Sequence, residues 1–152
     1  MTHNENHVVH VETCRWQGVE ELVYKDRDGK PTFKDVTRRT LFGEESGDGM
    51  EVRYFEVSAG GHTTLEKHEH THLVIPAKGR GSCLVDDQVM PLGMHDLLYV
   101  PSWAWHQFRA DDNEVFGFFC MVKVQRDRPT LPTPEELETL KANPEVAAFI
   151  RC

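Results

Sequence analysis

The chain has 152 residues, of which 39% are hydrophobic, and a formal net charge of −8. This length and hydrophobic content fit one folded domain with a core of its own and exclude a disordered chain. An acidic chain without a basic patch argues against nucleic-acid and anionic-membrane partners. The N-terminus lacks the apolar core of a signal peptide, and no run approaches ~20 apolar residues, so we expect a cytoplasmic protein.

The first part of the chain, residues 1–49, is only weakly patterned. We expect a short strand at 8–13, a strand or loop segment at 19–24, a turn at 28–31 and an alternating strand at 32–42. The sequence GEESGDG at 43–49 has the composition of a surface loop. We therefore treat this part as strands and loops that pack on the domain that follows.

Residues 50–124 carry a much stronger β pattern. The expected strands are 51–57, a histidine-bearing stretch after Gly60-Gly61, 82–85, 89–92, 96–100, 106–109 and 115–124, with a further turn at 76–81. Many short strands at this spacing indicate a sandwich or a barrel.

Residues 125–152 begin with a proline-rich connection and continue into two expected helices, at about 134–142 and 144–150. Thr133 suits an N-cap, Pro134 the first helical position, and Glu136 completes a capping box. Asn143-Pro144-Glu145 repeats this arrangement. We expect the helices to pack on the β domain or on a second subunit.

Histidines are the candidate metal ligands of this chain. His68, His70 and His72 alternate in sequence, so on a strand their rings point to the same face, and His106 follows a short aromatic loop downstream. Neutral imidazole is the commonest metal ligand in proteins. On a straight strand the Cα atoms of His68 and His72 would be about 13 Å apart. Either the strand bends so that the rings converge, or one histidine supports the others without binding directly.

These two stretches resemble the two motifs of the cupin family. The first motif is represented by Gly61, His68-Glu69-His70 and Gly79, with His72 where the family has glutamate. The second is represented by Pro101, Trp103 and His106 at the family spacing. Tryptophan replaces a glycine at 103, His95 replaces the opening glycine, and Ala110 replaces an asparagine.

The resemblance implies a cupin-type jelly roll, all-β apart from the C-terminal helices, with one divalent metal ion held by His68, His70, His72 and His106. Manganese or iron is favoured, and nickel, copper and zinc are further candidates because imidazole accepts all of them. Cupins are commonly dimers, so a homodimer is expected.

The cavity of such a barrel would bind a small molecule, and several residues are candidates for its wall. They are Tyr54, Glu66, Trp103, Trp105, Phe108 and Cys120. Cys14, Cys83, Cys120 and Cys152 are far apart and form no metal-binding pair, so we expect reduced thiols. Cys83 and Cys120 lie in apolar strands and suit small buried hydrophobes; the alternative is that Cys120 faces the metal.

The leading functional hypothesis is a small-molecule oxygenase of the dioxygenase type, because neutral nitrogen ligands leave an ion its charge and open positions for oxygen and substrate. One alternative is a metal-assisted isomerase, epimerase or lyase acting on a sugar or organic acid. Another is a cupin that binds a small ligand without turnover. The sequence assigns no catalytic residue.

A rival interpretation uses the same letters, because His68 to His72 match H-E-x-x-H, the signature of zinc proteases. That motif requires a helix, whereas glycines precede this segment and Val74-Ile75-Pro76 follows it.

Overall fold

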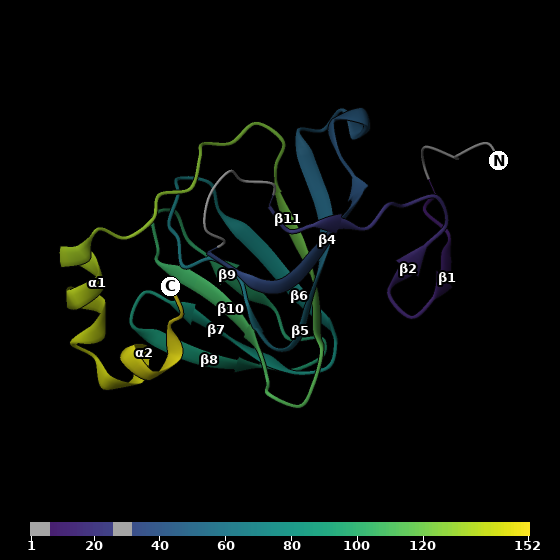
Figure 1. Ribbon diagram of the computed structural model, residues 1–152. Helices are drawn as coiled ribbons and strands as arrows, with labels where there is room; N and C mark the ends of the chain where they lie inside the picture. Colours follow the sequence, from purple (N-terminus) through teal and green to yellow (C-terminus); the bar gives the residue numbers. More distant parts are fainter. Residues whose placement is uncertain (1–6, 26–31) are drawn as a thin grey trace.

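The computed structural model describes residues 7–25 and 32–152, and within them the chain forms strands followed by two C-terminal helices (Figure 1). The strands are β1 (His10–Glu12), β2 (Arg15–Trp16), β3 (Leu22–Val23), β4 (Lys34–Phe42), β5 (Met50–His62), β6 (His72–Lys78), β7 (Gly81–Val85), β8 (Gln88–Leu92), β9 (Leu98–Val100), β10 (His106–Ala110) and β11 (Phe116–Lys123). The helices are the short 3-10 turn η1 (Glu44–Ser46), α1 (Pro134–Lys141) and α2 (Pro144–Phe149). The turn expected at 28–31 lies outside the described residues.

One nine-stranded antiparallel sheet carries the site. Its main path runs β8-β7-β10-β5-β11-β6-β9, and β4 pairs with β5 beside this path while β3 pairs with β4. β5 is 13 residues long and pairs with three strands, with Phe55 opposite both Arg38 and Phe118, and His62 opposite Arg109. Such a strand curls the sheet around a common interior. The predicted all-β jelly roll with two short C-terminal helices is confirmed.

The strand expected at 51–57 is longer than predicted and includes the glycine pair Gly60-Gly61. β5 continues through both residues to His62, where it reaches β10. A side chain at Gly61 would place its Cβ 2.7 Å from the carbonyl oxygen of Lys34, so glycine here permits the close approach of β4. The expected turn at 76–81 is also shorter, because β6 extends to Lys78.

The histidine-bearing segment is not the regular strand that alternation suggested. Between the end of β5 and the start of β6, residues 63–71 are irregular and make only isolated bridges, Glu66 to His106 and Lys67 to Thr130. The segment is not a helix either, so the zinc-protease interpretation is wrong. β6 begins at His72 itself.

The interior of the curled sheet is filled by aromatic and aliphatic side chains. Phe55, Val74, Phe108, Phe116 and Phe118 belong to this main core. A second cluster lies under the C-terminal helices, where Val146, Phe149 and Ile150 pack on Leu65 and Leu84. The helices thus cover one end of the sheet, and β1 and β2 form a separate hairpin at the opposite end (Figure 1).

The C-terminal helices begin as the sequence predicts. Thr133 accepts a hydrogen bond from the backbone N–H of Glu136, whose side chain accepts one from the backbone of Thr133, which completes the capping box. Asn143 caps α2 by accepting from the N–H of Glu145. Among the described residues, no helix has the length and apolarity needed to cross a membrane.

Candidate metal centre and cavity

Backbone hydrogen bonds hold the irregular segment so that its histidines face inward. Glu66 and His106 exchange backbone bonds of 3.1 and 2.9 Å, and Lys67 and Thr130 exchange bonds of 3.0 and 2.8 Å. The carbonyl of His68 accepts a 2.7 Å bond from the N–H of Trp103. The segment is therefore fixed on one side by the β9–β10 connection and on the other by the chain that follows β11.

This backbone brings four imidazole rings together. The ring centroids of His68 lie 3.5 Å from His70, 4.7 Å from His72 and 4.7 Å from His106. His72 and His106 are 5.2 Å apart, and all four residues are buried. The outer rings of His68 and His72 converge, whereas His70 stacks on His68 and its ligand atom groups with His68 and Asp127. Ligand atoms of His68, His72 and His106 lie within 4.8 Å of one another.

In His68, His70 and His106 the Nδ1 atom has a fixed hydrogen-bond partner, which determines whether Nε2 is free to bind a metal. The Nδ1 atom of His68 lies 2.7 Å from the carbonyl of His70, and that of His106 lies 3.0 Å from the carbonyl of Ala104. The Nδ1 atom of His70 lies 2.7 Å from Oδ1 of Asp127. A carbonyl or carboxylate only accepts, so each of these Nδ1 atoms carries the proton and each Nε2 keeps its lone pair.

Burial keeps these rings neutral. It lowers the pKa of His68 to about 3, with further lowering from the neighbouring His106 and His70. It also lowers the pKa of His72 well below its ordinary value. For His106 burial outweighs the opposing charge of Glu66, and for His70 it outweighs the hydrogen bond to Asp127, so both pKa values are lowered.

The cluster fits a divalent metal ion. The Nε2 atoms of His68 and His72 face each other at 2.9 Å. Two nitrogens bound at about 2.1 Å to one ion, and at right angles to each other, would be about 3 Å apart. Neutral rings with inward lone pairs are the ligand form that metals require. His68, His72 and His106 could thus hold the ion, with His70 as a fourth candidate.

The histidines form one wall of a cavity of about 420 Å³. Aromatic side chains line another part of it, namely Phe55, Phe108 and Phe118. Its charged residues are Lys25, Arg38, Arg53, Glu66, Arg126 and Asp127. Glu66 forms a buried ion pair with Lys25. The cavity is therefore lined by the candidate metal ligands, by aromatic side chains and by several basic groups.

Three of the residues proposed from the sequence for the cavity lie on its wall, Glu66, Phe108 and Cys120. Tyr54 does not, because it alternates with Arg53 and Phe55 along β5 and points to the other face. There its ring packs on Trp16 and Phe119, and its hydroxyl donates a 3.0 Å bond to Glu56.

The two tryptophans also lie outside the cavity wall. Trp103 is 53% exposed, and its backbone has a φ of 62°, in the region that favours glycine. Its main role in the site is the backbone N–H that it donates to His68. Trp105 packs with the cluster under the helices, and the Nζ atom of Lys67 lies 4.3 Å from its ring centroid.

The cavity residues proposed from the sequence included neither Asp127 nor any of the basic residues that line it. Besides binding the ring of His70, Asp127 accepts backbone bonds from Glu69, at 2.8 Å, and His70, at 3.1 Å. Partial burial opposes ionisation, but these bonds outweigh it and hold the pKa of Asp127 below its usual range. The sequence signal was the charged run Arg126-Asp127-Arg128, which begins three residues after the end of the last strand.

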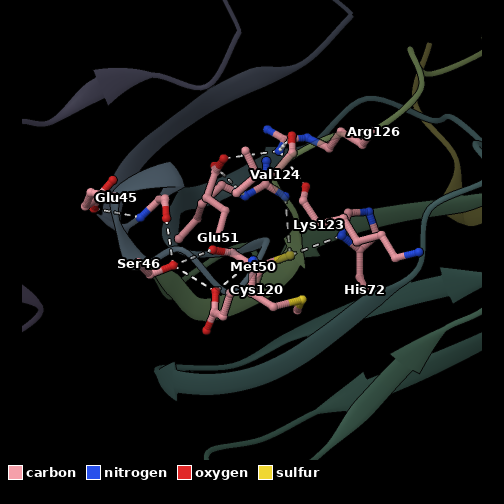
Figure 2. Close-up of polar contacts among 12 residues, drawn as sticks. Glu45, Ser46, Met50, Glu51, His72, Cys120, Lys123, Val124 and Arg126 are labelled. Atoms are coloured by element: carbon pink, nitrogen blue, oxygen red, sulfur yellow. Dashed lines mark hydrogen bonds and ion pairs between the residues drawn. The ribbon is translucent and has the colours of Figure 1, made fainter.

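Cys120 lies beside the candidate metal ligands, and Figure 2 shows its contact with His72. Its Sγ atom is 3.2 Å from Nδ1 of His72 and accepts a 3.6 Å bond from Nη2 of Arg53. Burial raises the pKa of the thiol, and the positive charge of Arg53 partly opposes this. In the ring form that binds a metal through Nε2, His72 donates its Nδ1–H to the sulfur. Two donors then face Cys120, and donors favour its thiolate.

Comparisons with known proteins agree with this arrangement. The cupin-domain family model matches residues 53–122. The 1-methylthio-D-xylulose 5-phosphate methylsulfurylase of Rhodospirillum rubrum is 49% identical over 138 residues, which cover 90% of this chain and 86% of that protein. A cupin 2 conserved barrel domain protein from Rhodopseudomonas palustris is 40% identical, with a TM-score of 0.90 over 96% of this chain and 99% of the other. A cupin-2 domain structure from R. rubrum is 47% identical, with a TM-score of 0.83 over 91% of each chain. The chain therefore belongs to the cupin family, as a small member with a single cupin domain.

Proposed function

We propose that this cupin is a metal-dependent enzyme that removes the methylthio group from a methylthio ketose phosphate. The name of the R. rubrum methylsulfurylase, at 49% identity, supports this substrate class. The observation that carries the proposal is the position of Cys120, whose thiol lies on the cavity wall next to the histidine cluster. A thiol can hold the methylthio group as a mixed disulfide, which a second thiol then removes by thiol–disulfide exchange.

The chemistry of such a substrate defines what the site must do. In a 1-methylthio 2-ketose the bond between C1 and sulfur is adjacent to a ketone. When that bond breaks with its electron pair on C1, the negative charge is shared with the ketone oxygen as an enolate. A divalent ion held by the histidines would supply Lewis-acid stabilisation of that oxygen.

In the proposed reaction Cys120 acts as the nucleophile. Its thiolate attacks the methylthio sulfur, a new sulfur–sulfur bond forms, and the bond between sulfur and C1 breaks to leave the enolate. Proton uptake at C1 then gives a 1-deoxy ketose phosphate. An external small thiol attacks the methyl disulfide on Cys120, leaves as its own methyl disulfide and restores the cysteine. The proton of that thiol balances the proton added at C1.

This proposal follows the alternative of a metal-assisted isomerase, epimerase or lyase acting on a sugar, in preference to the oxygenase. The named relative acts on a sugar phosphate, and the proposed reaction consumes no dioxygen. Manganese or iron is the proposed ion, with nickel, copper and zinc as further candidates.

The test uses metal-loaded protein, 1-methylthioxylulose 5-phosphate and a small thiol under anaerobic conditions. We expect the 1-deoxy ketose phosphate in NMR spectra, and we expect Cys120→Ser to abolish it. Without the external thiol, the intact mass should rise by one methylthio group minus one hydrogen. Cys83→Ser is the matched control, because Cys83 is equally buried but does not line the cavity. Turnover that needs dioxygen, or that survives in Cys120→Ser, contradicts the proposal.

A further inference from the structure

Three arginines from separate parts of the chain lie on the cavity wall, and the metal centre uses none of them. Arg38 is on β4, Arg53 is on β5, and Arg126 follows β11. In the pairing of β4 with β5, Arg53 is opposite Thr40, two residues from Arg38, so the two side chains are diagonal neighbours on one face. We refer to Arg38, Arg53 and Arg126 as the arginine cluster.

The charge of the cluster is only partly balanced. One carboxylate, that of Glu51, forms a 3.1 Å ion pair with Arg126 (Figure 2). The same carboxylate forms a 3.5 Å ion pair with Arg53. Burial, followed by the positive charge of Arg53, lowers the pKa of Arg38. Along the described wall, four basic residues face two acidic ones. A positive cavity in a chain of net charge −8 is the opposite of what composition alone would produce.

The cluster also has hydrogen-bond donors without acceptors. Among the described residues, the buried Nε atoms of Arg38 and Arg53 have no hydrogen-bond partner. Arg53 is 8% exposed, and its 3.5 Å ion pair with Glu51 lacks hydrogen-bond geometry. A third such atom belongs to Arg39, which does not line the cavity. Buried donors without acceptors are costly unless a ligand satisfies them.

We propose that the arginine cluster binds the phosphate group of a phosphorylated substrate. A phosphate dianion supplies several acceptor oxygens, and guanidinium groups match them with paired donors. The subsite deepens the proposed function and rests on it for the identity of the reacting end. Arg53 also donates to Cys120, which in turn contacts His72, so the subsite lies next to the nucleophile. A ketose phosphate would then lie with its phosphate at the arginines and its ketone at the histidines.

The test is direct binding, measured by calorimetry on metal-loaded protein with xylulose 5-phosphate, xylulose and inorganic phosphate. Arg38→Gln should weaken xylulose 5-phosphate binding about 10-fold or more, the expected loss of a charge-assisted hydrogen bond, and leave xylulose binding unchanged. Arg126→Gln should act in the same direction. Arg128→Gln is the matched control, with the same charge change two residues away on an exposed side chain outside the cavity.

The outcomes distinguish failure of the phosphate subsite from failure of the proposed function. Wild-type affinity for xylulose 5-phosphate in both Arg38→Gln and Arg126→Gln, or an equal loss in Arg128→Gln, overturns the subsite. Tight binding of inorganic phosphate without binding of the ester overturns its assignment to substrate. Arginine-dependent binding of the ester without removal of a methylthio group supports the subsite while contradicting the proposed function. Turnover of the methylthio substrate that is unchanged in Arg38→Gln supports the proposed function and contradicts the subsite.

Discussion

Asp127→Asn tests whether the residue behind His70 controls the metal centre. The carboxylate accepts three hydrogen bonds: Oδ1 takes those from the ring and the backbone N–H of His70, and Oδ2 takes the one from the backbone N–H of Glu69. Asparagine has one acceptor oxygen. If that oxygen keeps both bonds to His70, the amide NH₂ faces the N–H of Glu69, and two donors meet.

The magnitude follows from these three bonds. Hydrogen bonds to a charged group contribute about 1.5–3 kcal/mol and neutral ones about 0.5–1.5 kcal/mol, so His70 loses roughly 1–1.5 kcal/mol of support for its orientation and basicity. That corresponds to about 10-fold in metal affinity, and replacements of residues that support metal ligands fall in the range of about 10–100-fold. The unpaired N–H of Glu69 should lower the free energy of unfolding by a further ~1–3 kcal/mol.

The assay is competition for Mn²⁺ or Zn²⁺ between a chelating indicator and the metal-free protein, with unfolding in urea measured in parallel. Glu69→Gln is the control, because Glu69 lies between His68 and His70, loses the same charge and has an exposed side chain. We expect weaker metal binding in Asp127→Asn alone. Unchanged metal affinity in a folded Asp127→Asn protein, or an equal loss in Glu69→Gln, would refute the reasoning.

Three further predictions concern stability. The pKa of His68 is about 3 in the folded protein, below its value in the unfolded chain, so the metal-free protein should lose stability as the pH falls below about 6.5. The expected loss in free energy of unfolding is about 1.4 kcal/mol per pH unit for each such histidine. Urea unfolding measured at a series of pH values tests this, and a stability that does not change with pH contradicts it. Trp103→Gly should raise the free energy of unfolding by about 1 kcal/mol, because the φ of 62° at this position strains any residue with a side chain. Met94→Gly is the control at an exposed position without a positive φ, and it should lower the free energy of unfolding. A lower free energy of unfolding in Trp103→Gly would show that the indole itself stabilises the fold. Gly117→Ala should lower the free energy of unfolding by about 1–3 kcal/mol, because a Cβ there would lie 1.9 Å from the hydroxyl oxygen of Tyr54. In a double-mutant cycle, Tyr54→Phe should recover part of this stability, and additive effects of the two substitutions would exclude the contact as the cause.

The positions of most strands along the chain and the candidate metal ligands could be predicted from the sequence because they depend on local patterns. Alternation marks the strands, capping residues mark the helices, and His68, His70, His72 and His106 lie in the two stretches that resemble the cupin motifs. The backbone of the ligand segment was not accessible. Alternating histidines look like a strand, yet here three rings converge because the chain leaves the sheet and bonds to two other loops.

The arginine cluster could not be predicted from the sequence for a different reason. Arg38, Arg53 and Arg126 are far apart in sequence and come together only through the pairing of β4, β5 and β11. Tyr54 shows the same limit, since the phase of β5 decides whether Tyr54 or its neighbours face inward. By contrast, two departures from the family motif carried local information. Trp103 and His95 replace glycines, and both have positive φ angles, 62° and 71°.

The bridge between Lys67 and Thr130 ties the C-terminal tail to the loop that carries the candidate metal ligands. Through that bridge, the ion pair of Lys67 with Glu136 and the contacts of Asp127, the segment leading into α1 anchors the loop that presents His68 and His70. A protein truncated after β11 would keep every candidate ligand in its sequence and still lose the loop's outer anchor. Loosening of the tail and release of the ion should therefore occur together.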